Sequence, residues 1–64
     1  MQIKTVGDKI AEARRKVGLT QQQLAERLCV TNKAVSKWER GASLPDVALL
    51  VPLSRILGYS VQQL

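Results

Sequence analysis

The sequence predicts an all-α fold of five short helices, at about residues 6–17, 21–28, 32–40, 46–57 and 61–64. Three observations support this prediction. Glycines stand where helices would end, Ser or Thr residues stand where helices would begin, and apolar residues recur between them at helical spacing. No segment alternates between apolar and polar residues as a half-buried strand would. The 64 residues are therefore expected to form one domain that spans residues 1–64.

The first predicted helix begins after Thr5, which has Asp8 three residues further on. Its apolar stripe advances by four, three and four residues, as one face of a helix does, and consists of Val6, Ile10, Ala13 and Val17. Gly18 follows as a predicted stop, because glycine adopts the left-handed conformation of a helix end without a Cβ penalty.

The second and third helices are separated only by Cys29, Val30 and Thr31. So short a turn makes the helices cross steeply, and the small Ala25 lies where the next helix must pass close. Thr20, followed by Gln23 after three residues, predicts a capping box, and Thr31 predicts an N-cap. The side chains expected to face inward are Leu24, Leu28, Val30, Val35 and Trp38, so Trp38 is interpreted as core and not as a stacking platform.

The fourth helix is expected between Asp46 and the stop at Gly58, with Gly41 ending the helix before it. Its apolar stripe consists of Leu49, Leu50, Leu53, Ile56 and Leu57. Pro52 removes the hydrogen bond to the carbonyl of Ala48, so either the helix kinks there or regular helix begins later than residue 46. A second capping box, Ser60 with Gln63, predicts the fifth helix.

Composition excludes several functional classes. The chain has no His, the usual base of nucleophilic catalysis, and a domain this small has little room for a catalytic cleft, so we expect no enzyme. A single cysteine allows no internal disulfide and no cysteine zinc cluster, and we expect no metal or cofactor. With no signal-peptide pattern and no long apolar run, the predicted location is the cytoplasm, away from membranes.

The distribution of charge indicates a polyanionic partner. The net charge is +5, and nine of the ten basic residues and four of the five acidic residues lie within residues 1–41. Residues 42–64 hold only Arg55 and Asp46, which cancel. A basic part joined to a neutral part suggests one surface that faces a polyanion and one that packs, although charge alone also fits helices that are merely solvated.

Two neighbouring segments carry a family resemblance. They are Thr20 to Leu28, with the sequence Thr-Gln-Gln-Gln-Leu-Ala-Glu-Arg-Leu, and Val30 to Gly41, with the sequence Val-Thr-Asn-Lys-Ala-Val-Ser-Lys-Trp-Glu-Arg-Gly. Together they resemble the Cro/repressor-like (XRE-type) helix-turn-helix family. The resemblance extends over nearly the whole chain. It implies a compact five-helix lambda-repressor-like fold with the motif at about residues 21–40. It also implies a double-stranded DNA partner, with the helix at 32–40 in the major groove.

Matched position by position, the resemblance implies four base-reading residues, Asn32, Lys33, Ser36 and Lys37. Asn can pair bidentately with adenine, and Lys can donate to guanine. Ala34 fits either contact with a thymine methyl group or internal packing. The implied phosphate contacts come from Gln21, Gln22, Lys33, Arg40 and the backbone from Gly41 to Ser43. At its position, Gln21 is also expected to brace a base-reading side chain.

Two further expectations follow from the resemblance. Arg14 and Glu39 are expected to form a structural ion pair between the first and third helices, whereas Arg15 and Lys16 are expected to be solvated. The family often has Gly where this chain has Cys29. If the backbone has a positive φ there, a residue other than Gly lowers the stability of the fold by about 1 kcal/mol. We interpret Cys29 itself as a small buried hydrophobe and not as a redox switch.

The function predicted from the resemblance is a sequence-specific transcriptional regulator, commonly a repressor in bacteria or phages. Near-palindromic operators have half-sites about 34 Å apart, so a homodimer on DNA is expected. Two roles are open for the apolar residues near the C-terminus: they form a surface that a partner covers, or they close the core of the single chain. These residues are Leu57, Tyr59, Val61 and Leu64. The alternative is an antitoxin-type or other protein-interaction module with the same fold.

Overall fold

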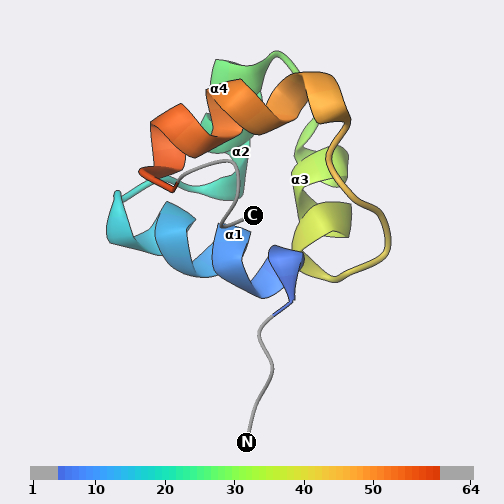
Figure 1. Ribbon diagram of the computed structural model, residues 1–64. Helices are drawn as coiled ribbons and strands as arrows, with labels where there is room; N and C mark the ends of the chain where they lie inside the picture. The colour runs from blue at the N-terminus through green and yellow to red at the C-terminus, as the bar shows by residue number, and fades with distance from the viewer. Residues whose placement is uncertain (1–4, 60–64) are drawn as a thin grey trace, which may run out of the picture.

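The computed structural model describes residues 5–59, which form four α-helices (Figure 1). They are α1 (Val6–Lys16), α2 (Gln21–Leu28), α3 (Asn32–Glu39) and α4 (Val47–Leu57). Residues 5–59 contain no strand, and each helix end lies within one residue of its predicted position, so the all-α prediction is confirmed. The predicted fifth helix at 61–64, with its cap at Ser60, lies outside the described residues.

The predicted starts of the first three helices are confirmed by their capping hydrogen bonds. At α2, Thr20 Oγ1 accepts from the Gln23 N–H at 3.0 Å, and Gln23 Oε1 accepts from the Thr20 N–H at 2.9 Å. Thr5 and Asp8 form the same reciprocal pair at α1, and Thr31 caps α3 alone. These bonds satisfy backbone donors that a helix leaves without partners at its first turn.

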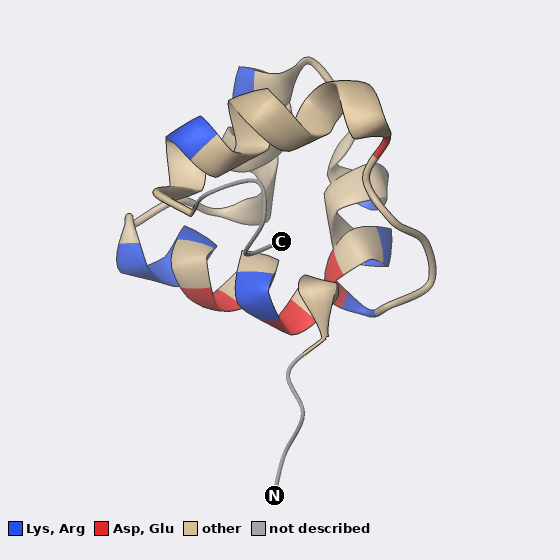
Figure 2. Cartoon of the chain, in the orientation of Figure 1, with Lys and Arg blue, Asp and Glu red and all other residues tan. Residues whose placement is uncertain are grey.

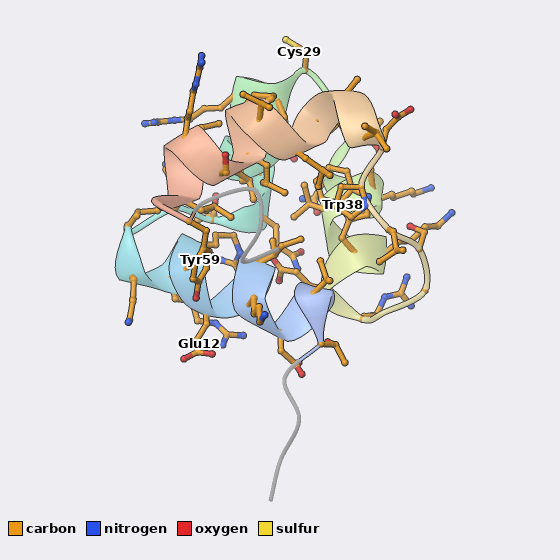
Figure 3. The ribbon with its side chains drawn as sticks, in the orientation of Figure 1. Glu12, Cys29, Trp38 and Tyr59 are labelled. Atoms are coloured by element: carbon orange, nitrogen blue, oxygen red, sulfur yellow. The ribbon has the colours of Figure 1, made fainter. Side chains whose placement is uncertain are left out.

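The core lies between the four helices and takes one fully inaccessible side chain from each: Ile10, Leu24, Val35 and Leu53. Around them lie the other buried members of the core cluster, Ala13, Ala25, Leu28, Trp38 and Leu57. The indole of Trp38 is 5% exposed, which confirms its prediction as core, and Figure 3 shows it directed toward the interior. Val30, predicted to face inward, is partly buried against this cluster.

Val17 corrects the predicted stripe of the first helix. The last residue of α1 is Lys16, and Val17 is the C-cap, with φ −86° and ψ 1°, so its side chain leaves the stripe and is 46% exposed. The buried face of α1 instead includes Gly7 and Ala11 beside Ile10 and Ala13.

Gly7 marks a close approach between two helices that sequence periodicity did not reveal. A Cβ at this position would collide with the carbonyl oxygen of Trp38 and would lie 2.9 Å from that of Glu39. The first turn of α1 therefore packs directly against the backbone at the end of α3, where only a hydrogen atom fits. This contact fixes where the C-terminal end of α3 lies.

The helix α4 continues through Pro52, so a start well after residue 46 is wrong. Asp46 is the N-cap, and its carboxylate accepts from the Ala48 N–H at 3.2 Å. Pro52 cannot donate to the Ala48 carbonyl, but Ala48 is exposed, so water can reach that oxygen.

Cys29 ends α2 in the left-handed conformation, with φ 58° and ψ 40°. The three predicted glycine stops, Gly18, Gly41 and Gly58, also have positive φ, between 76° and 78°. Our interpretation of Cys29 as a buried hydrophobe is wrong, because the left-handed cap turns its side chain outward, where it is exposed at the tip of the α2–α3 turn (Figure 3).

We predict that Cys29→Gly raises the free energy of unfolding by about 1 kcal/mol, because glycine tolerates positive φ without the strain of a Cβ. Equilibrium unfolding in urea measures this difference. Cys29→Ala is the matched control: it removes the thiol, keeps the Cβ and should bring no comparable gain. Equal effects of the two substitutions would assign the gain to loss of the thiol instead of relief of strain.

Candidate nucleic-acid interface

The four predicted base-reading residues lie together on one side of α3. Asn32, Lys33, Ser36 and Lys37 are spaced so that they share a face of the helix, and Val35 and Trp38 occupy the buried face. Asn32, Lys33 and Lys37 are exposed, whereas Ser36 is half-buried. Figure 2 shows basic residues along α3, so this helix presents a polar and cationic surface to solvent.

Ala34 does not belong to that surface. Its side chain is half-buried and packs against the core cluster, which favours the packing interpretation over contact with a thymine methyl group.

The predicted phosphate-contacting side chains lie at the start of α2 and after α3. Gln21 and Gln22 are the first two residues of α2, and Arg40 is the exposed C-cap of α3. At α2 the Gln23 N–H is occupied by the Thr20 hydroxyl. A helix leaves further N–H groups unpaired in its first turn, and these suit a phosphate.

The backbone from Gly41 to Ser43 does not fit its predicted role. The N–H of Gly41 donates to the Trp38 carbonyl at 3.1 Å, and those of Ala42 and Ser43 donate to the Lys37 carbonyl at 2.9 and 3.4 Å. These three donors therefore close the end of α3 and are already engaged within the chain. Both Gly41 and Ser43 are exposed, but backbone donation from either is a corrected expectation.

The predicted ion pair of Arg14 and Glu39 is present and bidentate. Arg14 Nε donates to Glu39 Oε2 at 2.7 Å, and Nη2 donates to Oε1 at 3.1 Å. The remaining Arg14 nitrogen, Nη1, donates to the Leu19 carbonyl at 2.9 Å. The two side chains are only 12% and 7% exposed, so this pair ties α1, the α1–α2 loop and α3 together.

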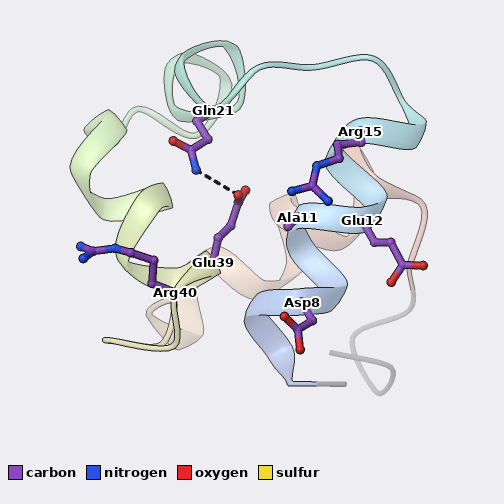
Figure 4. A pocket seen from close by; sticks show the side chains of 7 residues that line it. All are labelled: Asp8, Ala11, Glu12, Arg15, Gln21, Glu39 and Arg40. Atoms are coloured by element: carbon purple, nitrogen blue, oxygen red, sulfur yellow. Dashed lines mark hydrogen bonds between the residues drawn. The ribbon is translucent and has the colours of Figure 1, made fainter. Parts of the chain in front are cut away.

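Gln21 also joins this pair, through a contact that was not expected from the sequence. Gln21 Nε2 donates to Glu39 Oε1 at 3.0 Å, as the dashed line in Figure 4 shows. The Glu39 carboxylate thus accepts from Arg14 and from Gln21, and the start of α2 is bound to the end of α3. Only the three-dimensional arrangement brings residues 21 and 39 together, so no local pattern could have predicted the bond.

A hydrogen bond links Gln22, and not Gln21, to the predicted base-reading residue Asn32. Asn32 Nδ2 donates to Gln22 Oε1 at 3.1 Å, which links the first residue of α3 to the second residue of α2. Gln21 faces Glu39 instead, at the other end of α3. The expected bracing residue is therefore corrected by one position.

An open pocket lies between α1, the start of α2 and the end of α3 (Figure 4). Its lining residues are Asp8, Ala11, Glu12, Arg15, Gln21, Glu39 and Arg40. Because both acidic and basic side chains line it, the pocket lacks the uniform positive charge that would concentrate an anion. The surface suited to a polyanion is therefore the exposed face of α3 and not this pocket.

Within residues 5–59, exposed apolar side chains lie on and just before α4. Leu57 is buried in the core, and Tyr59 is packed partly against it, so for these two the core alternative holds; residues 61 and 64 lie outside the described range. Leu44 is instead 74% exposed, Val47 80% and Val51 47%. Val47 and Val51 are one turn apart on α4 and share a face.

No helix within residues 5–59 combines the length and the apolar character needed to cross a membrane.

Comparison with known proteins identifies relatives along nearly the whole chain. A family model described as "Helix-turn-helix" matches residues 10–64. The chain is 37% identical over 57 residues to the HTH-type transcriptional activator BcrR of Enterococcus faecalis, which covers 89% of this chain and 28% of BcrR. It is also 40% identical over 56 residues to the HTH-type transcriptional regulator DicA of Escherichia coli (strain K12). This match covers 88% of this chain and 42% of DicA.

A third relative is the HTH-type transcriptional regulator ImmR of Bacillus subtilis (strain 168), which is 37% identical to this chain over 60 residues. The match covers 94% of this chain and 47% of ImmR. The chain thus spans less than half the length of these three relatives. Among solved structures, the P22 c2 repressor in complex with a synthetic operator matches with a TM-score of 0.88 and 32% identity, covering 94% of this chain and 91% of that one.

We predict that Glu39→Gln lowers the free energy of unfolding by about 2 kcal/mol, since it removes the charge that the nearly buried Arg14 neutralises. Chemical unfolding measures the loss. The control is Glu26→Gln on the exposed surface of α2, which makes the same change of charge and should stay within about 0.5 kcal/mol of the parent. Equal losses in the two variants would contradict a structural role for the pair.

Proposed function

This chain belongs to the helix-turn-helix family, and we propose that it binds double-stranded DNA sequence-specifically and regulates transcription, with repression as its mode of action. The observation that carries the proposal is the exposed face of α3, which presents Asn32, Lys33 and Lys37 to solvent. The similarity to a repressor solved with its operator supports the same function. The role is one of binding, and we assign no catalytic step to this chain.

In the proposed complex, α3 lies in the major groove with its N-terminal residues at the base edges. Asn32 offers one acceptor and two donors, and Lys33 and Lys37 offer ammonium groups that suit guanine O6 and N7. Ser36, which is half-buried on the same face of α3, is the fourth proposed base contact.

Phosphate contacts on both sides of the groove would fix the position of α3. We assign them to Gln21 and Gln22 at the start of α2 and to Arg40 at the end of α3. Such contacts carry little sequence information, and the charged one, from Arg40, also releases counterions and makes affinity fall with salt.

We predict that Lys33→Ala/Lys37→Ala abolishes the enrichment of a specific site when duplexes of random sequence are selected for binding. Affinity should also become less dependent on salt, with the slope of log K against log salt falling by about 2 if both ammonium groups lie near phosphates.

The matched control is Lys16→Ala/Arg55→Ala, which also removes two exposed positive charges but leaves α3 unchanged. This control should select the same site as the parent chain, with weaker binding. If both double variants lose the site equally, the net charge of the protein determines binding and α3 does not read bases.

A second copy of the chain on the same DNA is the partner we propose. Near-palindromic sites present two half-sites, and the exposed Leu44, Val47 and Val51 provide apolar surface that a partner can cover. A protein partner of another kind remains the competing function of this surface.

We predict two chains per selected duplex in sedimentation equilibrium. Val47→Asn/Val51→Asn should make the second chain bind at least about tenfold more weakly, since covering two valines contributes more than 1.4 kcal/mol. Val17→Asn, at an exposed valine outside α4, is the control and should leave the stoichiometry unchanged. One chain per duplex in the parent protein would contradict the proposed dimer.

A further inference from the structure

We propose that the open pocket between α1, the start of α2 and the end of α3 binds a small zwitterion, a molecule that carries one ammonium and one carboxylate group, as amino acids do. The pocket has a volume of about 580 Å³, within the range of roughly 300–1,000 Å³ that small-molecule sites occupy. Its lining carries both signs of charge, which disfavours a simple anion or a simple cation but suits a ligand that carries both charges.

One face of α1 forms the floor of this pocket and places a charge at each end of it. Asp8, Ala11 and Arg15 are three and four residues apart, so they lie in a row on one side of the helix. The small, buried Ala11 in the middle leaves room between the two charged side chains. Asp8 and Arg15 are about 10 Å apart along the helix axis, and the Arg15 guanidinium is turned back toward Ala11 (Figure 4). A short ligand can therefore reach both charges.

Both of these charged groups are available to a ligand. No hydrogen bond or ion pair within residues 5–59 engages the Arg15 side chain, which is exposed. Asp8 Oδ2 accepts from the Thr5 N–H at 3.1 Å, but Oδ1 has no partner among the described residues. The guanidinium can therefore pair with a ligand carboxylate, and Oδ1 can accept from a ligand ammonium.

The other charged residues around the pocket contribute less to binding. The Glu39 carboxylate already accepts three hydrogen bonds within the chain and is only 7% exposed. Figure 4 shows the side chains of Glu12 and Arg40 directed away from the pocket. The ammonium of the ligand is therefore assigned to Asp8 and its carboxylate to Arg15.

The facing wall of the pocket belongs to the proposed DNA interface. Gln21 and Arg40 both line the pocket and are proposed phosphate contacts. A ligand seated beside Gln21 brings a carboxylate to the place that a phosphate would approach, so we expect ligand and DNA to compete. By linkage, DNA then lowers the affinity for the ligand by the same factor. This competition rests on the proposed function, whereas binding of the ligand to the free chain does not.

Ligand binding is tested on the free chain by two-dimensional heteronuclear NMR titration. The probes are zwitterions of rising length: glycine, γ-aminobutyrate and ε-aminocaproate. Each probe has two controls, a carboxylate and an amine that keep its carbon chain but carry only one of its charges.

Three variants are compared with the parent chain. Arg15→Gln and Asp8→Asn each remove one charge from the pocket, and Asp8→Asn keeps an acceptor for the Thr5 N–H of the capping box. Lys16→Gln is the matched control, because it removes an exposed positive charge from α1 outside the pocket. The NMR spectra themselves verify that each variant is folded.

We predict that at least one probe shifts the amide resonances around the pocket saturably and binds at least about tenfold more tightly than its two controls, because only the zwitterion makes both charge-assisted contacts. Arg15→Gln and Asp8→Asn should each reduce the affinity for this probe to that of a singly charged control. Lys16→Gln should keep the affinity of the parent chain.

The site would be overturned by any of three results: no saturable shift with any probe, equal affinities for a zwitterion and its controls, or an equal loss in Lys16→Gln. The competition is measured on the selected duplex, where a probe at about ten times its Kd should weaken DNA binding about tenfold. Unchanged DNA affinity would overturn the competition but not the site. If the parent chain selects no duplex, the proposed function fails, and the titration of the free chain still decides whether the pocket binds zwitterions.

Discussion

The carboxylate of Glu39 is held almost out of water by donors from two other helices, and the placement of α3 depends on it. Arg14 donates two hydrogen bonds to it from α1, and Gln21 donates a third from α2. Removing a charge from water is unfavourable, and this penalty is offset only when all hydrogen-bond partners of the charged group are present and well aligned. The arrangement therefore favours one relative position of α1, α2 and α3 over others.

Steric packing fixes the same end of α3. Gly7 brings the backbone of α1 against the carbonyl groups of Trp38 and Glu39, so neither helix can shift inward or rotate without a clash. Trp38 and Val35 anchor the buried face of α3 in the core. With its end and its inner face fixed, α3 presents its polar face as a rigid surface, as base reading requires.

The fold could be predicted closely from the sequence because its main signals are local. A capping residue such as Thr20 satisfies its bonds within three residues, and apolar spacing along α2 and α4 requires no knowledge of distant contacts. The errors have local causes as well. Val17 continues the helical spacing, but the helix has already ended, and a spacing rule cannot detect that. Cys29 is apolar in type, but its left-handed backbone turns the side chain to solvent.

The site was predictable to a lesser degree. The face of α3 follows from helical spacing once the family resemblance places it, and the Arg14–Glu39 pair follows from the resemblance. The links from α2 to α3 do not, because Gln21 and Gln22 are adjacent and chemically identical, and only their directions on the helix separate their partners. The turn of the N–H groups after α3 back onto its carbonyls follows from the predicted glycine stop at Gly41, and the expectation that these groups contact phosphate did not take it into account.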